Sequence, residues 1–421
     1  MTQLKVVRWI ATLPLSVCLF VSKTNAQEEP FRPELGKFPP LEKAHSFRGE
    51  LTFVDHANRR GSLRIQGAGT YFRNAPHPFA MLPFGIVRYH GAPSELRDIP
   101  IGTVLHARGF LPPNPKLSSV PVLPVNNRNK TVGYSGKGIA PAENHLILLE
   151  DEPSFCQREG KVWKLKEVEL QNNTGKIIAR REAKIGANKA EEETLTFDAA
   201  TRIWRGREKL EVADLVADGI WPANGKKTLN DQAVLLGITW KPTPSNIFTR
   251  FHISDIWLDD VAMQRAARNQ TETHKAFIRT RWMPGWIDAV EYGKFGTATV
   301  TATLFGGMDE SLYADFKKDS SALMNAVESN LKHTHGAYSP AHMASKGPIL
   351  DVMKTKGDIP FGSSGIQIKF KTDLIIEGIR PGRNIRVRPS HWPHVNIPRE
   401  EYLGGNTPEE RFPTPAIFPK Y

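Results

Sequence analysis

The fold is decided by residues 193–242, which read ETLTFDAATRIWRGREKLEVADLVADGIWPANGKKTLNDQAVLLGITWKP. This stretch begins with strand-forming residues and continues through a short basic and aromatic crossing that contains Trp204. An acidic and apolar corner, Asp214-Leu215, precedes Gly219, and a closing apolar run ends at Trp240. A hairpin, a crossing strand, a glycine corner and a closing strand are the signals by which five short strands close without free edges. We therefore expect a small β-barrel here.

The same outline occurs before and after this stretch. Asp98-Ile99 precedes Gly102 in the first copy, and Gly91 corresponds to Gly206 after an apolar and aromatic run. In the third copy, Ile379-Arg380-Pro381 precedes Gly382. A repeated outline predicts several units of one architecture. The expected fold is mainly β, with tandem small OB-like β-barrels, a connector helix and a helical insertion in the third unit.

Composition and periodicity divide the 421 residues into segments. We expect a signal peptide at 1–26, a Pro-rich tether at 27–45, OB-like β domains at 46–153, 161–242 and 276–398, a connector helix at 255–275, a helical insertion at about 309–348 and a Pro-rich tail at 399–421.

A family resemblance rests on the same motifs. The strand end Thr201-Arg202-Ile203, followed by Asp214-Leu215 and then Gly219, resembles small exported bacterial domains with an OB-like fold, whose function is unknown or loosely assigned. The resemblance covers the second unit best, the first less, and the third with an insertion. The second unit departs from it at Trp221-Pro222, where a long turn precedes the closing strand, so strand order stays open.

The N-terminus predicts export. Lys5 and Arg8 precede an apolar stretch from Ile10 to Val21, and Thr24-Asn25-Ala26 offers small residues before a cleavage point. This is the pattern of a secretory signal peptide, although a retained N-terminal anchor has the same features. After cleavage no segment is long enough to span a membrane, and Cys156 is the single cysteine. A large exported chain without disulfides favours a secreted, periplasmic or cell-envelope protein of bacteria.

The charge favours anionic partners. The formal net charge is +12, and it falls to +9 when the three basic residues of the signal peptide are removed. A moderate basic excess raises the expectation of polysaccharide, lipid head groups or nucleic acid as partners, and it is equally compatible with solubility. Export argues against nucleic acid and shifts the expectation to an envelope polysaccharide or another polyanion.

Basic residues alternate with aromatic ones at three places, which form the candidate ligand-binding face. OB barrels bind oligosaccharides or oligonucleotides with such residues on an exposed sheet face. In the third unit the period of two places Arg386 and Arg388 on a solvated face, opposite Ile385 and Val387. The alternative is a strand with its polar side in water and tryptophans in the core. The candidates are Arg202, Trp204, Arg205, Arg279, Arg281, Trp282, Arg383, Arg386, Arg388 and Trp392.

Five late histidines form an alternative site. Imidazole with thioether suits copper, and imidazole alone suits zinc. No thiol or carboxylate signature accompanies them, so surface histidines are the competing interpretation. The five are His333, His335, His342, His391 and His394.

No motif indicates an enzyme. Asp255, Asp259 and Asp260 offer paired carboxylates for a hydrolase, but a helix cap explains them as well. No phosphate loop or dinucleotide fingerprint occurs. The sequence therefore predicts an exported, non-enzymatic binding or scaffolding protein without a cofactor. A copper or zinc protein and a hydrolase with an unrecognised site remain as alternatives.

Overall fold

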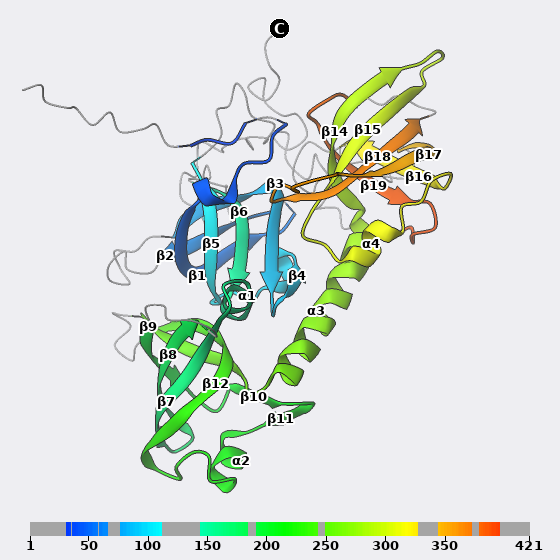
Figure 1. The fold of residues 1–421 in the computed structure, drawn as a ribbon. Coiled ribbons are helices and arrows are strands. Elements are labelled where there is room, and N and C mark those ends of the chain that lie inside the picture. The colour runs from blue at the N-terminus through cyan, green and yellow to red at the C-terminus, as the bar shows by residue number, and fades with distance from the viewer. Residues whose placement is uncertain are drawn as a thin grey trace, which may run out of the picture. The chain divides into compact units, whose positions relative to one another are not determined.

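The structure is a computed structural model, and it describes residues 31–34, 36–57, 59–65, 76–111, 144–183, 191–242, 249–326, 344–372 and 379–395. These residues form three sheets and few helices, so the protein is mainly β, as predicted (Figure 1). The expected signal peptide and C-terminal tail lie outside the described residues. Within the described part of the expected tether, Phe38 packs on the fold, since the centroid of its ring lies 4.3 Å from that of Trp286.

The first sheet closes into a five-stranded barrel, which we call barrel A. Its strands pair in the order β1, β2, β3, β6, β5 and back to β1, and only the β3–β6 pair is parallel. This Greek-key closure is the arrangement of an OB-like barrel. The elements are η1 (Leu41–Lys43), β1 (His45–Asp55), β2 (Arg60–Ile65), β3 (His77–Tyr89), β4 (Ala92–Ser94), η2 (Leu96–Asp98), β5 (Val104–Phe110) and β6 (Asn144–Asp151).

The second sheet, sheet B, repeats this pairing order. Strands β7, β8, β9, β13 and β12 follow one another, β12 pairs with β7, and β9 meets β13 in parallel at Thr196 and His252. Strand β13 extends the sheet past Pro242, where we expected the unit to end. The elements are α1 (Glu152–Arg158), β7 (Lys161–Gln171), β8 (Thr174–Ala183), β9 (Glu191–Phe197), β10 (Arg202–Arg205), β11 (Glu208–Leu210), α2 (Val212–Ala217), β12 (Gly225–Pro242) and β13 (Thr249–Trp257).

The repeated corners share one local structure. In barrel A, the backbone N–H of Glu95 donates to Asp98, and the corner ends at Gly102 with φ +94°. In sheet B, the backbone N–H of Glu211 donates to Asp214, and the corner ends at Gly219 with φ +69°. Both glycines face open space, so the left-handed backbone alone requires glycine there. The internal repeat seen in the sequence is therefore a repeated capping box followed by a glycine.

Helix α3 (Asp260–Arg281) is the expected connector, shifted toward the C-terminus from the predicted 255–275. Asp259 caps it, since its carboxylate accepts from the backbone N–H of Ala262 at 2.8 Å. Asp255 lies in β13 and not in the helix. None of the described helices combines the length and apolarity that a membrane crossing requires.

The third sheet is a closed barrel of six strands, barrel C. Its strands pair in the order β14, β15, β18, β17, β16, β19 and back to β14, and every pair is antiparallel. It therefore lacks the parallel pair of the first two sheets. The elements are β14 (Met283–Tyr292), β15 (Ala298–Phe305), α4 (Glu310–Ala314), β16 (Ser321–Ala326), β17 (Ser345–Lys354), β18 (Ser363–Thr372) and β19 (Asn384–Pro389).

The helical insertion expected at about 309–348 is wrong for the described residues after Ala314, and residues 327–343 of it lie outside the described residues. Asp309 caps α4, and the helix ends at Ala314. Leu323, which falls within the expected insertion, lies in strand β16. Leu323 pairs with Lys346 of β17 and with Arg388 of β19, and this pairing places it in a strand. Gly382, the third predicted corner, precedes β19 with φ +79°, so each of the three glycine corners precedes a strand of a different sheet.

Two contact regions, one ionic and one aromatic, connect barrel A with its neighbours, and we call them the ionic joint and the aromatic joint. The ionic joint toward sheet B is centred on Glu152, whose carboxylate contacts Arg48, His106 and Arg181. The aromatic joint toward barrel C consists of Phe38, Phe84, Trp286 and Phe305.

Candidate functional site

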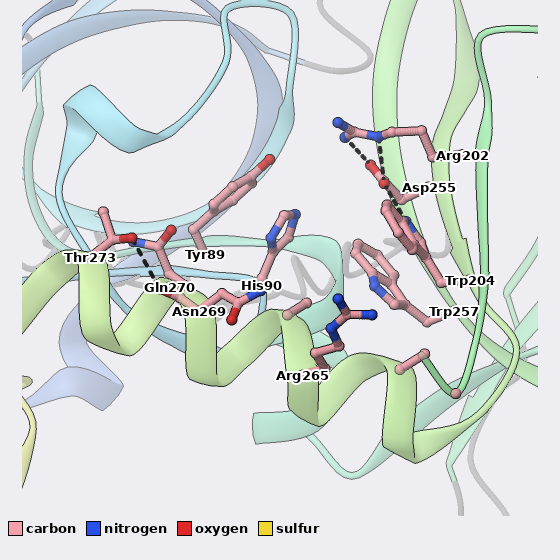
Figure 2. Close-up of a pocket in the computed structure, with 13 residues that line it drawn as sticks. Tyr89, His90, Arg202, Trp204, Asp255, Trp257, Arg265, Asn269, Gln270 and Thr273 are labelled. Atoms are coloured by element: carbon pink, nitrogen blue, oxygen red, sulfur yellow. Dashed lines mark hydrogen bonds and ion pairs between the residues drawn. The ribbon is translucent and has the colours of Figure 1, made fainter. Parts of the chain in front are cut away.

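A pocket of about 310 Å³ lies where barrel A, sheet B and α3 meet, and we call it the α3 pocket (Figure 2). Its size is at the lower end of the range for small-molecule sites, about 300–1,000 Å³. The lining residues come from the end of β3, from β10 and β13, and from one face of α3. They are Tyr89, His90, Arg202, Trp204, Gly206, Asp255, Trp257, Ala262, Arg265, Ala266, Asn269, Gln270 and Thr273.

One stripe of α3 forms a wall of the pocket. The six helical lining residues, from Ala262 to Thr273, recur every three or four positions and therefore share one face. Gln270 fixes this face on barrel A, because its amide nitrogen donates to Asp98 at 3.1 Å and to Ser94 at 3.2 Å. Asp98 belongs to the repeated corner, so the corner positions the helix that lines the pocket.

Aromatic rings form the other walls. The rings of Tyr89 and His90 stack with centroids 3.8 Å apart, and His90 meets Trp257 edge-on at 5.1 Å. The backbone N–H of His90 donates to Asp151 at 2.8 Å, which holds the strand end in place. Burial lowers the pKa of His90 to about 4, with smaller effects from Asp255 and Arg202. The imidazole is therefore neutral at neutral pH.

Asp255 holds the sheet B side of the pocket together. Its carboxylate accepts from Arg202 Nε at 2.8 Å, from Arg202 Nη2 at 2.6 Å and from Trp204 Nε1 at 3.1 Å. Figure 2 shows these contacts aligning Trp204 beside Trp257. Two parallel bonds from one guanidinium fix the carboxylate in both position and orientation. Asp255 thus orients Trp204, and its charge is already compensated.

Replacing Arg202 with methionine is expected to lower the free energy of unfolding by about 1 kcal/mol. The effect is small for a bidentate pair because the Arg202 side chain is 47% exposed, so water screens its charge, and Trp204 still donates to Asp255. Urea denaturation followed by fluorescence measures the change. Arg205→Met is the control, because Arg205 and its ion-pair partner Asp218 are both exposed. A loss as large as that of a buried pair would contradict this view.

Three polar groups in the pocket have no side-chain partner among the described residues. The guanidinium of Arg265 donates only to the backbone oxygen of Arg207. The indole N–H of Trp257 and the side-chain amide of Asn269 make no hydrogen bond within the described ranges. These donors and acceptors converge on an aromatic-walled pocket, which is the composition of a site for a small polar ligand.

The sequence-predicted basic and aromatic residues separate in space. Arg202 and Trp204 line the α3 pocket, whereas Arg205 pairs with Asp218 at 2.9 Å and does not line it. The sequence missed His90, Arg265 and Asn269, since they belong to no basic and aromatic run. The stripe along α3 was the available signal, because its polar members alternate with alanines on one helical face.

The second and third predicted stretches do meet, at the junction of α3 and barrel C, but as a structural cluster. Trp392 Nε1 donates to Asp315 at 2.9 Å, and Arg279 lies 3.5 Å from the same carboxylate. The remaining members, Arg281 and Trp282, are buried where the helix ends. Arg383 precedes β19, and its backbone oxygen accepts from Ile287 at 3.0 Å. These residues join the helix to the barrel, and none of them lines the α3 pocket.

The solvated face expected for Arg386 and Arg388 is wrong, because both are buried. Arg386 Nη1 donates to the carbonyl of Trp282 at 2.9 Å, just past the last residue of α3. A cation at a helix C-terminus satisfies carbonyls that lack an intrahelical partner. Arg388 packs over the ring of Trp282 with 5.2 Å to its centroid. Strand β19 is buried on both faces, so a period of two did not separate core from solvent.

The late histidines do not form a site within the described residues. His391 lies 3.9 Å from Asp315 and is largely exposed, and His394 is exposed as well. His333, His335 and His342 lie outside the described residues. In the described part of the chain, no three histidine, cysteine or acidic side chains form a cluster that could hold a metal ion. Comparison of the sequence with protein-family models and with curated proteins gives no match.

Proposed function

We propose that the protein is an exported, non-enzymatic binding protein that holds one acidic sugar unit of an envelope polysaccharide in the α3 pocket. The main support for this proposal is that one small pocket combines stacked aromatic rings with polar groups that have no side-chain partner among the described residues. Sugar rings have apolar faces and polar edges, so they match flat aromatic walls with polar groups at the margin.

The charge of the pocket favours an acidic ligand. Arg202 and Asp255 neutralise each other, and the neutral imidazole of His90 adds no charge. Arg265 therefore contributes one uncompensated positive charge from the helix face. A guanidinium recognises a carboxylate through paired N–H donors. A sugar ring with one carboxylate, as in a uronic acid, matches this single positive charge.

The carboxylates of the pocket favour binding over hydrolysis. Glycoside hydrolysis uses two carboxyl groups beside the scissile bond, one of them able to carry a proton. Among the described residues Asp255 is the one acidic residue that lines the pocket, and its carboxylate already accepts three hydrogen bonds from Arg202 and Trp204. A second acidic group is needed for that chemistry, and none lines this pocket within the described ranges.

Replacing Arg265 with glutamine is expected to weaken the binding of uronic acid oligosaccharides about 10-fold to 100-fold, because it removes one charged hydrogen-bond donor to the ligand. Isothermal titration calorimetry on the full chain measures the affinity. Arg268→Gln is the matched control, because Arg268 lies on the same helix, is exposed and does not line the pocket. Equal affinities for the two variants would reject the site.

A neutral ligand tests the chemistry of the proposal separately. Oligosaccharides in which the carboxylates are reduced to hydroxymethyl groups should bind the wild type about as weakly as the acidic ones bind Arg265→Gln. The wild type and the variant should then bind the reduced ligand equally. If the wild type prefers the reduced ligand, Arg265 does not recognise an anion.

A further inference from the structure

The tip of the β14–β15 hairpin exposes two aromatic side chains. Phe295 is 98% exposed and Tyr292 is 64% exposed, and they flank Gly293 and Lys294 in the connecting turn. No other large hydrophobic residue of the described chain exceeds 58% exposure. Figure 1 shows the turn at the free end of the hairpin. A single exposed apolar residue needs no explanation, but two at one protruding turn indicate a contact.

The turn is ordered. The Tyr292 hydroxyl donates to the carbonyl of Ile379 at 3.5 Å, so Phe295 is the ring that stands fully in water. The backbone N–H of Gly293 donates to Thr297 at 2.8 Å, and the Thr297 hydroxyl donates to the carbonyl of Lys294 at 2.8 Å. Phe295 has φ +56°, a left-handed backbone that phenylalanine rarely adopts. The open space around Gly296 shows that no neighbouring residue packs against that side of the turn. Phe295 is thus in an unfavourable backbone and in water, without a folding contact to compensate.

Two exposed lysines lie near the tip. Lys294 is exposed within the turn itself, and Lys371 is exposed on β18, next to Thr299 of the hairpin. Glu291 is the acidic residue of the turn region, and Lys369 lies 3.4 Å from it. Among the described residues, Lys294 and Lys371 therefore have no acidic partner beside the aromatic rings. Aromatic rings with flanking lysines suit the interface of an anionic bilayer, where rings enter and ammonium groups stay at the head groups.

We propose that this tip, Tyr292–Phe295, inserts into the surface of a membrane that contains anionic lipids. A lipid surface accounts for the tip better than a protein groove does. A stable protein interface buries about 800 Å² on each partner, far more than two side chains at a turn supply. Insertion into a head-group region needs only a few rings and cations at a protruding point.

Co-sedimentation of the full chain with vesicles tests the proposal. The wild type should bind vesicles that contain phosphatidylglycerol and bind pure phosphatidylcholine vesicles about fivefold more weakly for each lysine involved. Phe295→Ser should lower partitioning onto the anionic vesicles about 10-fold to 100-fold, because it removes the ring that the proposal places in the bilayer. Lys294→Gln should lower it about fivefold. Phe295 has no packing contact to lose, so its variant should fold as the wild type does.

Ile359→Ser is the matched control, since it removes an exposed apolar side chain elsewhere in barrel C and should leave partitioning unchanged. Three results would overturn the proposal. They are the absence of wild-type binding to anionic vesicles, partitioning that Phe295→Ser leaves unchanged, and an equal loss with Ile359→Ser. A tip that instead docks on a protein would give the first of these.

Discussion

Replacing Glu152 with glutamine is expected to lower the free energy of unfolding by about 3 kcal/mol, the lower end of the range for a broken buried ion pair. Glu152 is fully buried, and its carboxylate lies 3.0 Å from Arg48, 2.7 Å from His106 and 2.5 Å from Arg181. Glutamine keeps the volume and removes the charge, so the buried guanidinium of Arg181 and the partly buried one of Arg48 lose their shared anion. We expect the lower end of this range of free energies because Arg48 keeps its contact with Glu193 and Arg181 keeps its contact with Glu191.

Glu192→Gln is the control for this variant. Its partner Lys166 is exposed, so urea denaturation should show a change within about 0.5 kcal/mol. A Glu152 variant as stable as this control would mean that the ionic joint does not hold barrel A and sheet B together.

The difference in stability between wild type and Glu152→Gln should depend on pH. Burial opposes the charge of Glu152, but Arg48, His106 and Arg181 outweigh it and hold the pKa of this carboxyl well below its usual 4.5. A depressed acid pKa stabilises the folded state above the unfolded pKa, and this stability is lost as the pH falls through the folded pKa. The difference should therefore be constant from pH 7 to pH 5 and shrink below 4.5. A difference that grows in acid would contradict the ionised state of Glu152.

The sequence predicted the two repeated sheets because their signals are local. The glutamate, aspartate and glycine of each corner act within eight or nine residues, from Glu95 to Gly102 and from Glu211 to Gly219. Barrel C was harder to predict from the sequence, because β16 and β19 are defined by pairing between strands that lie far apart in the chain. From the sequence alone, Arg386 is expected to face solvent. Its burial is explained only by the end of α3, about 100 positions earlier in the chain.

The pocket could be predicted only in part for the same reason. Arg202 and Trp204 lie in one short basic and aromatic run, and both line it. His90 and Arg265 reach the pocket from segments separated by 175 positions, which only the packing of α3 on barrel A brings together. Periodicity identifies a helix face but not the surface it covers.

Replacing Trp286 with alanine is expected to lower the free energy of unfolding by about 3–5 kcal/mol, because it removes a large buried ring and leaves a cavity. Trp286 is the centre of the aromatic joint. Its ring lies 4.3 Å from Phe38, 5.6 Å from Phe84 and 5.6 Å from Phe305, and it is buried. Trp240→Ala, a partly exposed tryptophan of sheet B, should cost less. Denaturation by urea compares the two variants.

A double-mutant cycle shows whether this joint links the two barrels. Phe84 belongs to β3 of barrel A and Trp286 to β14 of barrel C, so a coupling between them acts across the joint. Edge-to-face pairs contribute about 0.5–1.5 kcal/mol beyond burial, so Phe84→Ala and Trp286→Ala together should cost less than the sum of the two. Strict additivity would mean that the rings pack within their own barrels. Because these contacts carry no charge, the coupling should be the same at pH 7 and pH 4, whereas the contribution of Glu152 to the ionic joint declines.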